Sequence, residues 1–345
     1  MSDQLVPGRP AGRTRARSVP LALAILGLLL VALSITSLML GARPISVSTV
    51  RDAFLHYDPG MTDHIVVRQY RLPRTILCLL CGAAFGTAGA LIQASTRNPL
   101  ADPGILGVNA GAAFAVILAV GVFSFASITA YVWFALAGAA MAGLLVYTIG
   151  ASAGGATPVR LLLSGVAISA VLGGIGSSVT LLDPQAFDSL RHWQVGTVAG
   201  RNLAVAATVA PFIVAGLLLA LIAAPALNAA ALGDDTARAL GLNLSRLRIT
   251  AILSVTLLAG SATAATGPIS FIGLMMPYAA RWIVGSDQRR IIPLTMLCSV
   301  NLLLAADIAG RLLIYPDELD AGIVVAFLGA PVLIMLARSA RTKTL

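Results

Sequence analysis

Long apolar stretches alternate with short polar connections along almost the whole chain. A helix that spans a bilayer needs about 20 mostly apolar residues, and ten stretches are candidates. They cover residues 19–40, 73–95, 105–124, 126–148, 159–182, 204–225, 247–267, 269–284, 291–313 and 321–338. Only Gly267-Pro268 separates the seventh stretch from the eighth, so nine spans result if these two form one broken helix. The pattern predicts an all-α integral membrane protein with about ten transmembrane helices.

Polar segments at the two ends flank the apolar region and give the chain three parts. A basic N-terminal tail (1–18) precedes a transmembrane domain (19–338), and a short tail (339–345) follows it. The first span is longer than the roughly 7–15 apolar residues of a secretory signal, so we expect an uncleaved helix. With ten spans, fifteen of the 23 lysines and arginines fall on the side that holds both termini. Cytoplasmic loops are enriched in these residues, which predicts cytoplasmic termini and a multi-pass protein of the cytoplasmic (inner) membrane.

The composition agrees with this topology and narrows the partners. Hydrophobic residues make up 58% of the chain and the mean hydropathy is +0.92, values that soluble domains do not show. The net charge of +9 is explained by topology and by contact with anionic membrane lipid. Nucleic acid is not an expected partner, because the pattern contains no basic soluble domain to bind it.

Several kinds of chemistry lack the residues that they need. The single lysine, Lys343, lies two residues from the C-terminus, so the chain cannot contain the GxxxxGK[ST] loop of a P-loop ATPase. The spans contain no catalytic constellation, and Cys78 and Cys81 lie in an apolar helix that opposes thiolate formation. We therefore expect no catalytic residue, no metal site and no cofactor in this chain, and we do not predict an enzyme.

Acidic residues inside membrane spans mark the relays of ion-coupled transporters. Nine of the ten spans contain none, and the exception is Asp307. Arg311 follows four residues later on the same helix face, in the favourable order for an acid and a base. This spacing predicts a structural ion pair rather than a proton relay, and it leaves an ion-coupled secondary transporter as the less favoured alternative.

The second and fifth spans are rich in small residues, which let helix backbones approach closely in lipid. We therefore expect the second span at the centre of the bundle and a rigid turn after it. For the fifth span two interpretations stay open, close helix packing or the wall of a wide transport pathway, so these residues are predicted as packing or pathway residues. The residues concerned are Gly82, Gly86, Gly89, Gln93, Asn98, Pro99, Ser164, Gly173 and Gly174.

Three arginines recur at three-residue spacing where the second span begins: Arg68, Arg71 and Arg74. On the predicted topology they form a basic patch on the outer face. Such side chains can snorkel to lipid headgroups. The alternative is a docking site for an acidic protein surface, because arginine pairs with carboxylates through two parallel hydrogen bonds.

A short charged stretch, LGDDTARALGLN at 232–243, interrupts the apolar pattern between the sixth and seventh spans. Asp234 and Asp235 suit a helix N-terminus, where negative charge is favourable, and Arg238 follows three residues after Asp235. Gly241 suits the C-terminal cap. The stretch therefore predicts a helix of two turns on the cytoplasmic side.

A helix this short is marginal in water by itself, so it needs a surface to lie against. Leu232, Ala237 and Leu240 provide a small apolar side for that contact. Because the chain has no ATPase motif of its own, we expect the surface to belong to a cytoplasmic partner rather than to the bundle itself.

In their order along the chain, these motifs resemble the permease subunits of the ABC importers for iron–siderophores, haem and vitamin B12, the FecCD type. The resemblance covers the chain from Arg71 to about Arg338. It depends on RLPR (71–74), the glycine-rich second span, RNPLADPGILG (97–107), Trp193 with Gly196, LGDDTARALG (232–241), TGPISFIGL (266–274), ADIAGR (306–311) and GIVVAFLGAP (322–331).

The resemblance implies the type II ABC importer permease fold and a larger assembly. Two permease chains, either two copies or this chain with a paralogue, form one pathway. Two ABC ATPase subunits bind ATP and Mg²⁺ beneath them, and an extracytoplasmic substrate-binding protein delivers the cargo. A ferric siderophore is the implied cargo, because most members of the family carry one, with cobalamin or haem as the alternative.

The resemblance also implies roles for particular residues. Arginines of the family that match Arg71, Arg74 and Arg311 face glutamates of the binding protein. An ATPase-coupling helix corresponds to Asp234, Asp235, Thr236, Ala237, Arg238, Leu240 and Gly241.

Three positions depart from the family pattern. Tyr278 and Gln288 stand where the family tends to have histidine, and Asp320 stands where it has the proline of ELPVG. The last change removes a turn-forming proline and adds a negative charge beside the expected docking face.

Overall fold

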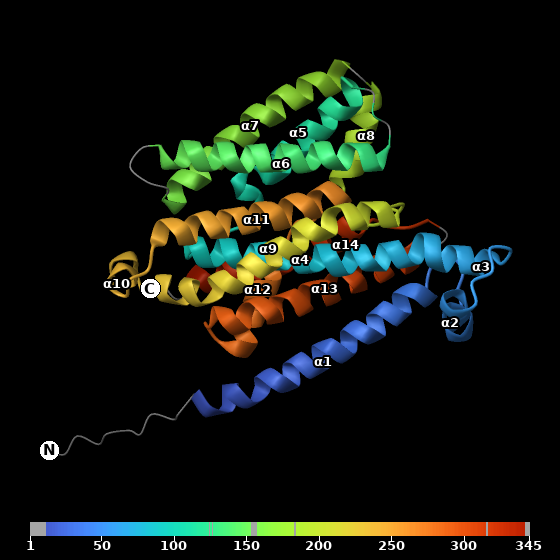
Figure 1. Cartoon of the computed structure of the whole chain (residues 1–345), viewed down its shortest axis with the longest axis horizontal. Helices are drawn as coiled ribbons and strands as arrows, with labels where there is room; N and C mark the ends of the chain where they lie inside the picture. The colour runs from blue at the N-terminus through green and yellow to red at the C-terminus, as the bar shows by residue number, and fades with distance from the viewer. Residues whose placement is uncertain are drawn as a thin grey trace.

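The computed structural model describes residues 12–123, 125, 127–152, 157–182, 184–314 and 317–341. Every regular element in these ranges is helical, and the long helices lie side by side in one bundle (Figure 1). The elements are α1 (Gly12–Met39), α2 (Val47–Leu55), α3 (Thr62–Ile65), η1 (Val66–Arg71), α4 (Leu72–Thr96), η2 (Pro103–Leu106), α5 (Val108–Gly121), α6 (Ile128–Ala151), α7 (Pro158–Leu182), α8 (Pro184–Gln194), α9 (Leu203–Ala230), α10 (Asp234–Ala239), α11 (Leu244–Thr266), α12 (Ile272–Val284), α13 (Gln288–Leu313) and α14 (Ala321–Arg341).

Each of the ten apolar stretches coincides with one helix. In the part of the chain that the structure describes, seven helices are long and apolar enough to cross a membrane, judged by length and composition: α1, α4, α6, α7, α9, α11 and α13. Three shorter apolar helices, α5, α12 and α14, complete the set. The predicted fold class is therefore confirmed. The seventh and eighth stretches are two helices, because the backbone turns between them at Gly267 and Phe271, where φ is 77° and 70°.

Helix α4 is the centre of the bundle and contacts α9, α11, α12 and α13. Its small residues allow this: a Cβ on Gly82 would lie 2.8 Å from the Cα of Val300 in α13, and one on Gly89 would lie 2.0 Å from the carbonyl oxygen of Gly273 in α12. Van der Waals packing of this kind drives helix association where lipid offers no hydrophobic contrast.

Helices α5, α6 and α7 form a second group, which α6 and α5 join to α11 of the central group (Figure 1). Gly111 of α5 and Gly138 of α6 lie close together in this group. A Cβ on either residue would lie 2.3 Å from the carbonyl oxygen of the other. Small residues thus set the helix spacing in both groups.

Polar elements gather at the two ends of the bundle. One end holds α2, α3 and η1, and we call it the α2 end (Figure 1). The opposite end holds α10 and the connection from α9, and we call it the α10 end. Helix α4 has 25 residues, which at about 1.5 Å per residue gives a length of roughly 37 Å. It joins the two ends.

Candidate functional site

The charged stretch near residue 234 forms a helix, as predicted, with six residues in α10. Gly233 precedes it with φ 111°, and Gly241 follows it with φ 80°. The N–H groups of Gly241 and Leu242 donate to the carbonyl oxygens of Arg238 and Ala237, which is the hydrogen-bond pattern of a glycine-terminated helix. The prediction for Gly241 is confirmed.

The expected apolar side of α10 is divided between two faces. Ala237 is fully buried against the bundle, whereas Leu232 and Leu240 are 65% and 64% exposed. The prediction that these three residues share one contact surface is therefore wrong. Ala237 packs on the chain's own helices, and the two leucines remain on an outer face with Thr236 and the fully exposed side chain of Asp235.

Asp234 lies on the inner face of α10 and uses both carboxylate oxygens. Oδ1 accepts from Nη2 of Arg97, at the end of α4, at 2.5 Å, and Oδ2 accepts from Nη2 of Arg248, in α11, at 2.7 Å. Arg97 Nη2 also donates to the carbonyl oxygen of Ala230, where α9 ends. The sequence did not predict these contacts, because Arg97 lies 137 residues from Asp234.

The charge state of Asp234 follows from these neighbours. Partial burial raises the pKa of the carboxyl, but the hydrogen bond from Arg97 and the charges of Arg248, Arg97 and Arg238 outweigh it, so the pKa lies below its ordinary value. A carboxyl whose pKa is lowered by folding contributes its stabilisation above the ordinary pKa and loses it as the pH falls through the lowered one. The contacts are therefore complete at neutral pH.

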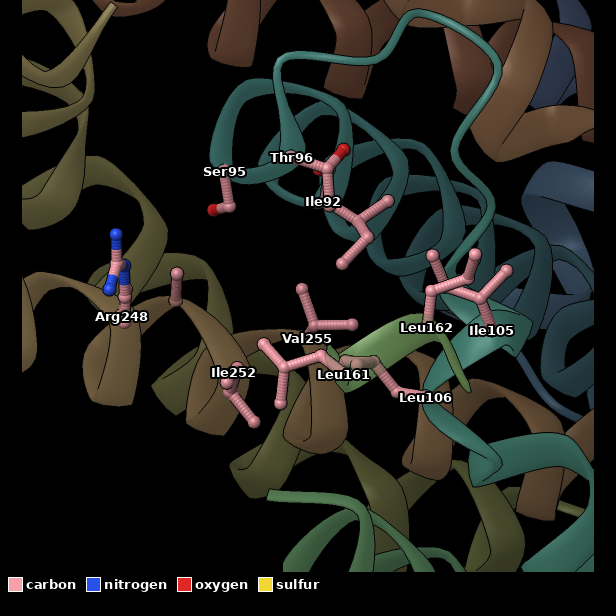
Figure 2. Close-up of a pocket in the computed structure, with 11 residues that line it drawn as sticks. Ile92, Ser95, Thr96, Ile105, Leu106, Leu161, Leu162, Arg248, Ile252 and Val255 are labelled. Atoms are coloured by element: carbon pink, nitrogen blue, oxygen red, sulfur yellow. The ribbon is translucent and has the colours of Figure 1, made fainter. Parts of the chain in front are cut away.

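Two cavities border Arg248. A small apolar one of about 30 Å³ lies between α4, η2, α7 and α11 (Figure 2). A larger one of about 170 Å³ lies between the end of α4, the end of α9 and the start of α11, and Asp234 and Arg97 also line it. The helices are thus incompletely packed around the charged contacts of α10.

At the α2 end, Arg71 is buried and bonded to backbone. Its Nη1 donates to the carbonyl oxygens of Leu38 and Met39 at 2.8 and 2.7 Å, and its Nη2 donates to that of Arg43 at 2.5 Å. The carbonyl groups where a helix ends carry partial negative charge. Arg71 therefore ties the end of α1 to the start of α4.

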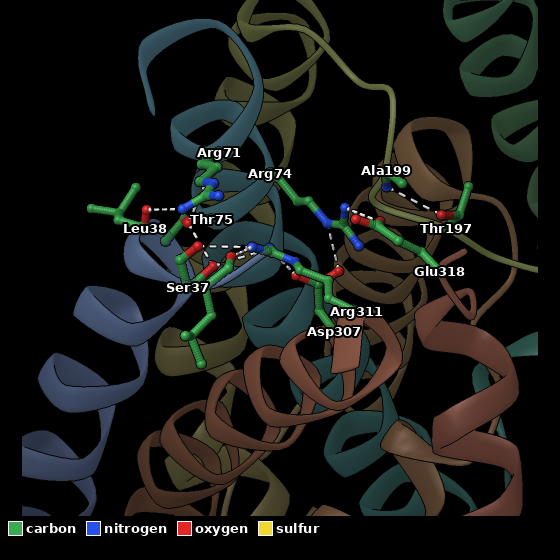
Figure 3. A network of polar contacts seen from close by, with 11 residues as sticks. Ser37, Leu38, Arg71, Arg74, Thr75, Thr197, Ala199, Asp307, Arg311 and Glu318 are labelled. Atoms are coloured by element: carbon green, nitrogen blue, oxygen red, sulfur yellow. Dashed lines mark hydrogen bonds and ion pairs between the residues drawn. The ribbon is translucent and has the colours of Figure 1, made fainter. Parts of the chain in front are cut away.

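Asp307 lies fully buried between two arginines (Figure 3). It accepts from Nε of Arg74 at 2.7 Å and from Nη2 of Arg311. The predicted ion pair of Asp307 with Arg311 is confirmed. Arg74 also donates to Oε2 of Glu318 at 2.6 Å, and Arg311 donates to the carbonyl oxygen of Ser37 at 2.7 Å.

The expected outward orientation is wrong for Arg71, which is buried, and Arg311 is buried as well. Arg68 is only half-buried and lies over the ring of Tyr57, with its guanidinium carbon 4.6 Å from the ring centroid. Internal acceptors outcompete an outward orientation, because a buried guanidinium needs hydrogen bonds. Arg74 keeps a small exposed fraction beside Glu318.

A cavity of about 290 Å³ opens beside this network, and Arg43, Arg71, Arg74, Arg201, Arg311 and Glu318 are among the residues that line it. Arg201, in the loop before α9, is 93% buried, its exposed fraction being 7%. Its Nη1 donates to the hydroxyl of Tyr131, whereas its Nε has no hydrogen-bond partner. Sequence reasoning missed Arg201, since no motif marked it.

The glycines of α4 allow close helix packing, because a Cβ at Gly82 or Gly89 would clash with the neighbouring backbone. Gly86 likewise leaves room for the side chain of Ser299 in α13. Gln93 is buried and donates to the carbonyl oxygen of Gly273 at 3.0 Å while accepting from Arg281 at 2.6 Å. It holds the start of α12 against the end of α4. In the exposed turn that follows, Asn98 accepts from the N–H of Leu100, and Pro99 lies beside it.

Two neighbouring glycines of α7 differ from those of α4, because they meet no other part of the chain. A Cβ added to Gly173 or Gly174 would have no atom within 4 Å, and Ser164 is half-buried. A cavity of about 430 Å³ between α5, α7 and α8 reaches Gly173. This face is open, and the interpretation of Ser164, Gly173 and Gly174 as pathway residues stays a prediction.

The three departures from the family pattern fall in ordered positions. Tyr278 is half-buried in α12. The N–H of Gln288 donates to Oδ1 of Asn228 at 2.8 Å. Asp320 accepts through its backbone carbonyl from the N–H groups of Ile323 and Val324, so it starts α14 without the proline of the family. Among the described residues, no group of three His, Cys, Asp or Glu side chains could hold a metal ion.

Comparisons with known proteins agree over nearly the whole chain. Residues 29–339 match the FecCD transport family. The ferric enterobactin transport system permease protein FepD of Escherichia coli is 48% identical over 94% of this chain and 96% of its own length. The Fe(3+)-citrate import system permease protein YfmD of Bacillus subtilis is 39% identical over 88% and 90%. An inward-facing, metal-chelate type ABC transporter has a TM-score of 0.82 at 28% identity, covering 93% of this chain and 99% of the matched one.

Proposed function

Because the chain belongs to the FecCD transport family of membrane permeases, we propose that it is the permease subunit of an ATP-driven importer that moves a ferric siderophore across the cytoplasmic membrane. The observation that supports this most directly is the identity of 48% with a ferric enterobactin permease over nearly the full length of both chains. Relatives named for ferric citrate and ferric hydroxamate also favour a ferric chelate over cobalamin or haem.

The ATP-hydrolysing step belongs to partner subunits, since this chain's single lysine excludes a P-loop. Two ABC ATPases would bind ATP and Mg²⁺, and α10 would seat in one of them. The outer face of α10 suits this role: it presents Asp235, Thr236, Arg238 and Leu240 to solvent, and a short helix with exposed leucines gains from a partner's groove. On this assignment the α10 end and both termini are cytoplasmic.

The α2 end would then receive the substrate-binding protein. Its cavity contains five arginines and one glutamate, so it attracts carboxylates and orients an acidic partner surface. Because Arg71 and Arg311 are bonded internally, their role is to position the cavity wall. Arg43, which is largely exposed, and Arg74 and Arg201 have donors left to offer.

A second permease chain completes the pathway on this proposal. At Gly173 and Gly174 of α7, an added Cβ would meet no atom of this chain within 4 Å. A copy of this chain or a paralogue would close the pathway there, and membrane lipid would cover the remaining apolar surface.

The first test is affinity purification of the chain from its native membranes in mild detergent, with mass identification of the co-purifying subunits and their copy numbers. A P-loop ATPase at equal copy number, and ATP-dependent uptake of a radiolabelled ferric siderophore into proteoliposomes, are the expected results. Uptake of cobalamin or haem but not of the siderophore would show that the proposed cargo is wrong. Uptake without ATP would refute the importer and favour an ion-coupled carrier.

A further inference from the structure

Helix α10 has few buried contacts with the rest of the chain, since Ala237 is its one buried residue. Gly233 and Gly241 flank it, both with positive φ. A Cβ at Gly241 would have no neighbour within 4 Å, and one at Gly233 would meet only the hydroxyl of Thr236 at 4.0 Å. Glycine in open space lets the backbone pivot, so the two connections alone do not fix the direction of α10.

The inner face of α10 contributes one small buried side chain, that of Ala237. An alanine methyl group has little apolar surface, so burying it stabilises the contact only weakly. The remaining inward contact is Asp234, which lies three residues earlier on the same face. Its two oxygens bind Arg97 and Arg248, which come from two different spanning helices.

Each of the two arginines is itself anchored. Arg97 caps α4 with a left-handed backbone, φ 51°, and also donates to the last turn of α9 through Ala230. Arg248 lies in the second turn of α11. A cavity is lined by all three charged residues, Asp234, Arg97 and Arg248, so charge contacts rather than dense packing join α10 to α4 and α11 here.

We propose that Asp234, Arg97 and Arg248 form an ionic latch that makes α10 move as one body with α4 and α11. The inference deepens the proposed function, on which it rests: the latch would convert the motion of an ATPase seated on the outer face of α10 into tilting of two central helices. The three residues are positioning residues, since they touch neither ATP nor cargo.

Helix α4 connects this latch to the opposite end of the bundle. Arg97 is at one end of the helix, and Arg74, which borders the cavity proposed for the binding protein, is at the other. A rigid helix of roughly 37 Å between them links the two docking faces mechanically. Without the latch, α10 would pivot on its two glycines while an ATPase remained seated on it.

The test uses the complete importer, with its partner permease, ATPases and binding protein, reconstituted in proteoliposomes. ATP hydrolysis and uptake of ferric siderophore are measured together, and the ratio of the two is compared. The variants are Asp234→Asn, Arg248→Gln and Asp234→Glu. Arg290→Gln is the matched control, because it removes an arginine from an exposed ion pair with Asp287 near the end of α9.

We expect Asp234→Asn and Arg248→Gln to keep ATPases at wild-type copy number while chelate transported per ATP falls roughly fivefold or more, the range of coupling changes at such networks. Asp234→Glu keeps the charge and should restore most of the ratio. Hydrogen exchange of the α10 amides should accelerate in Asp234→Asn and not in Arg290→Gln.

Two results would overturn the latch. The first is a ratio of chelate transported to ATP hydrolysed within about twofold of wild type in both Asp234→Asn and Arg248→Gln. The second is loss of the ATPases from those complexes, which would mean that Asp234 helps to bind the ATPase rather than to transmit its motion. If Asp234→Asn does not assemble, Arg248→Gln and Asp234→Glu still decide between these results. A wild-type complex that binds no ATPase would refute the proposed function itself, and the latch with it.

Discussion

The buried carboxylate of Asp307 is the residue on which the α2 end depends most. It pairs with Arg74 and Arg311, and those arginines also bond to Glu318 and to the end of α1. A buried charge whose partner is removed has neither water nor a counterion to stabilise it. One carboxylate thus keeps two guanidinium groups in place.

We expect Asp307→Ala to lower the free energy of unfolding by about 3–5 kcal/mol, because both arginines lose their buried counterion. Chemical unfolding in detergent micelles, followed by circular dichroism, measures the change. Arg51→Gln is the control: its contact with Asp52 is 4.0 Å long and exposed, so its effect should stay within about 0.5 kcal/mol. Equal effects of the two substitutions would contradict the structural role of Asp307.

At the scale of elements, small residues decide which helices of this bundle can touch. Gly89 of α4 faces the backbone of α12, whereas Gly174 of α7 faces open space. The two glycines therefore give a matched pair in which the same substitution has different consequences.

Gly89→Ala should destabilise the protein by about 1–3 kcal/mol, because the added methyl group meets the backbone of Gly273 and cannot be accommodated by a side-chain rotation. Gly174→Ala should change stability by less than about 0.5 kcal/mol. Both are measured by the same unfolding experiment in detergent. A neutral Gly89→Ala would show that α4 and α12 can separate at no cost.

Helix α10 presents Leu240 outward, and this exposed side chain is the residue most suited to fill a pocket of the ATPase. We expect Leu240→Ala to weaken ATPase binding by roughly tenfold, as for other central apolar interface residues. Surface plasmon resonance of the permease in nanodiscs measures the affinity. Leu253→Ala, which trims an exposed leucine of α11, should leave the affinity unchanged, and a comparable loss there would argue against a specific seat for α10.

At the scale of the whole molecule, a central helix joins two polar ends that each depend on a shared carboxylate. Asp307 accepts from two arginines at the α2 end, and Asp234 accepts from two at the α10 end. Glu318, in an exposed loop, accepts a hydrogen bond from Nη1 of Arg74. A carboxylate of a partner protein could take its place on that donor.

Glu318→Gln should tighten binding of the substrate-binding protein roughly threefold or more, because a neutral amide holds the Nη1 group of Arg74 less strongly than a carboxylate and yields it to an incoming carboxylate. Binding is measured by titrating the protein onto the permease complex in nanodiscs at constant ionic strength. Asp317→Asn is the control: it removes the same charge from the neighbouring exposed residue, so it measures the effect of net charge alone on binding. A weaker complex with Glu318→Gln would mean that Glu318 itself supports docking.

Much of the molecule followed from the sequence by itself. The membrane requires each spanning segment to satisfy its own backbone hydrogen bonds, so apolar length alone predicted ten helices, and the structure contains one in each stretch. Local spacing sufficed for α10, for its glycine end at Gly241, and for the pair of Asp307 with Arg311, since these contacts lie within one or two helical turns.

Only the tertiary structure decided which distant groups meet. The sequence placed Arg71 and Arg311 on an outer face, but the end of α1 supplies carbonyl oxygens that bury both. Arg74 reaches Asp307 across 233 residues, and Asp234 reaches Arg97 across 137. A charged side chain takes the partner that packing brings within about 3 Å, and in a bundle assembled through small residues that partner depends on how every helix is stacked.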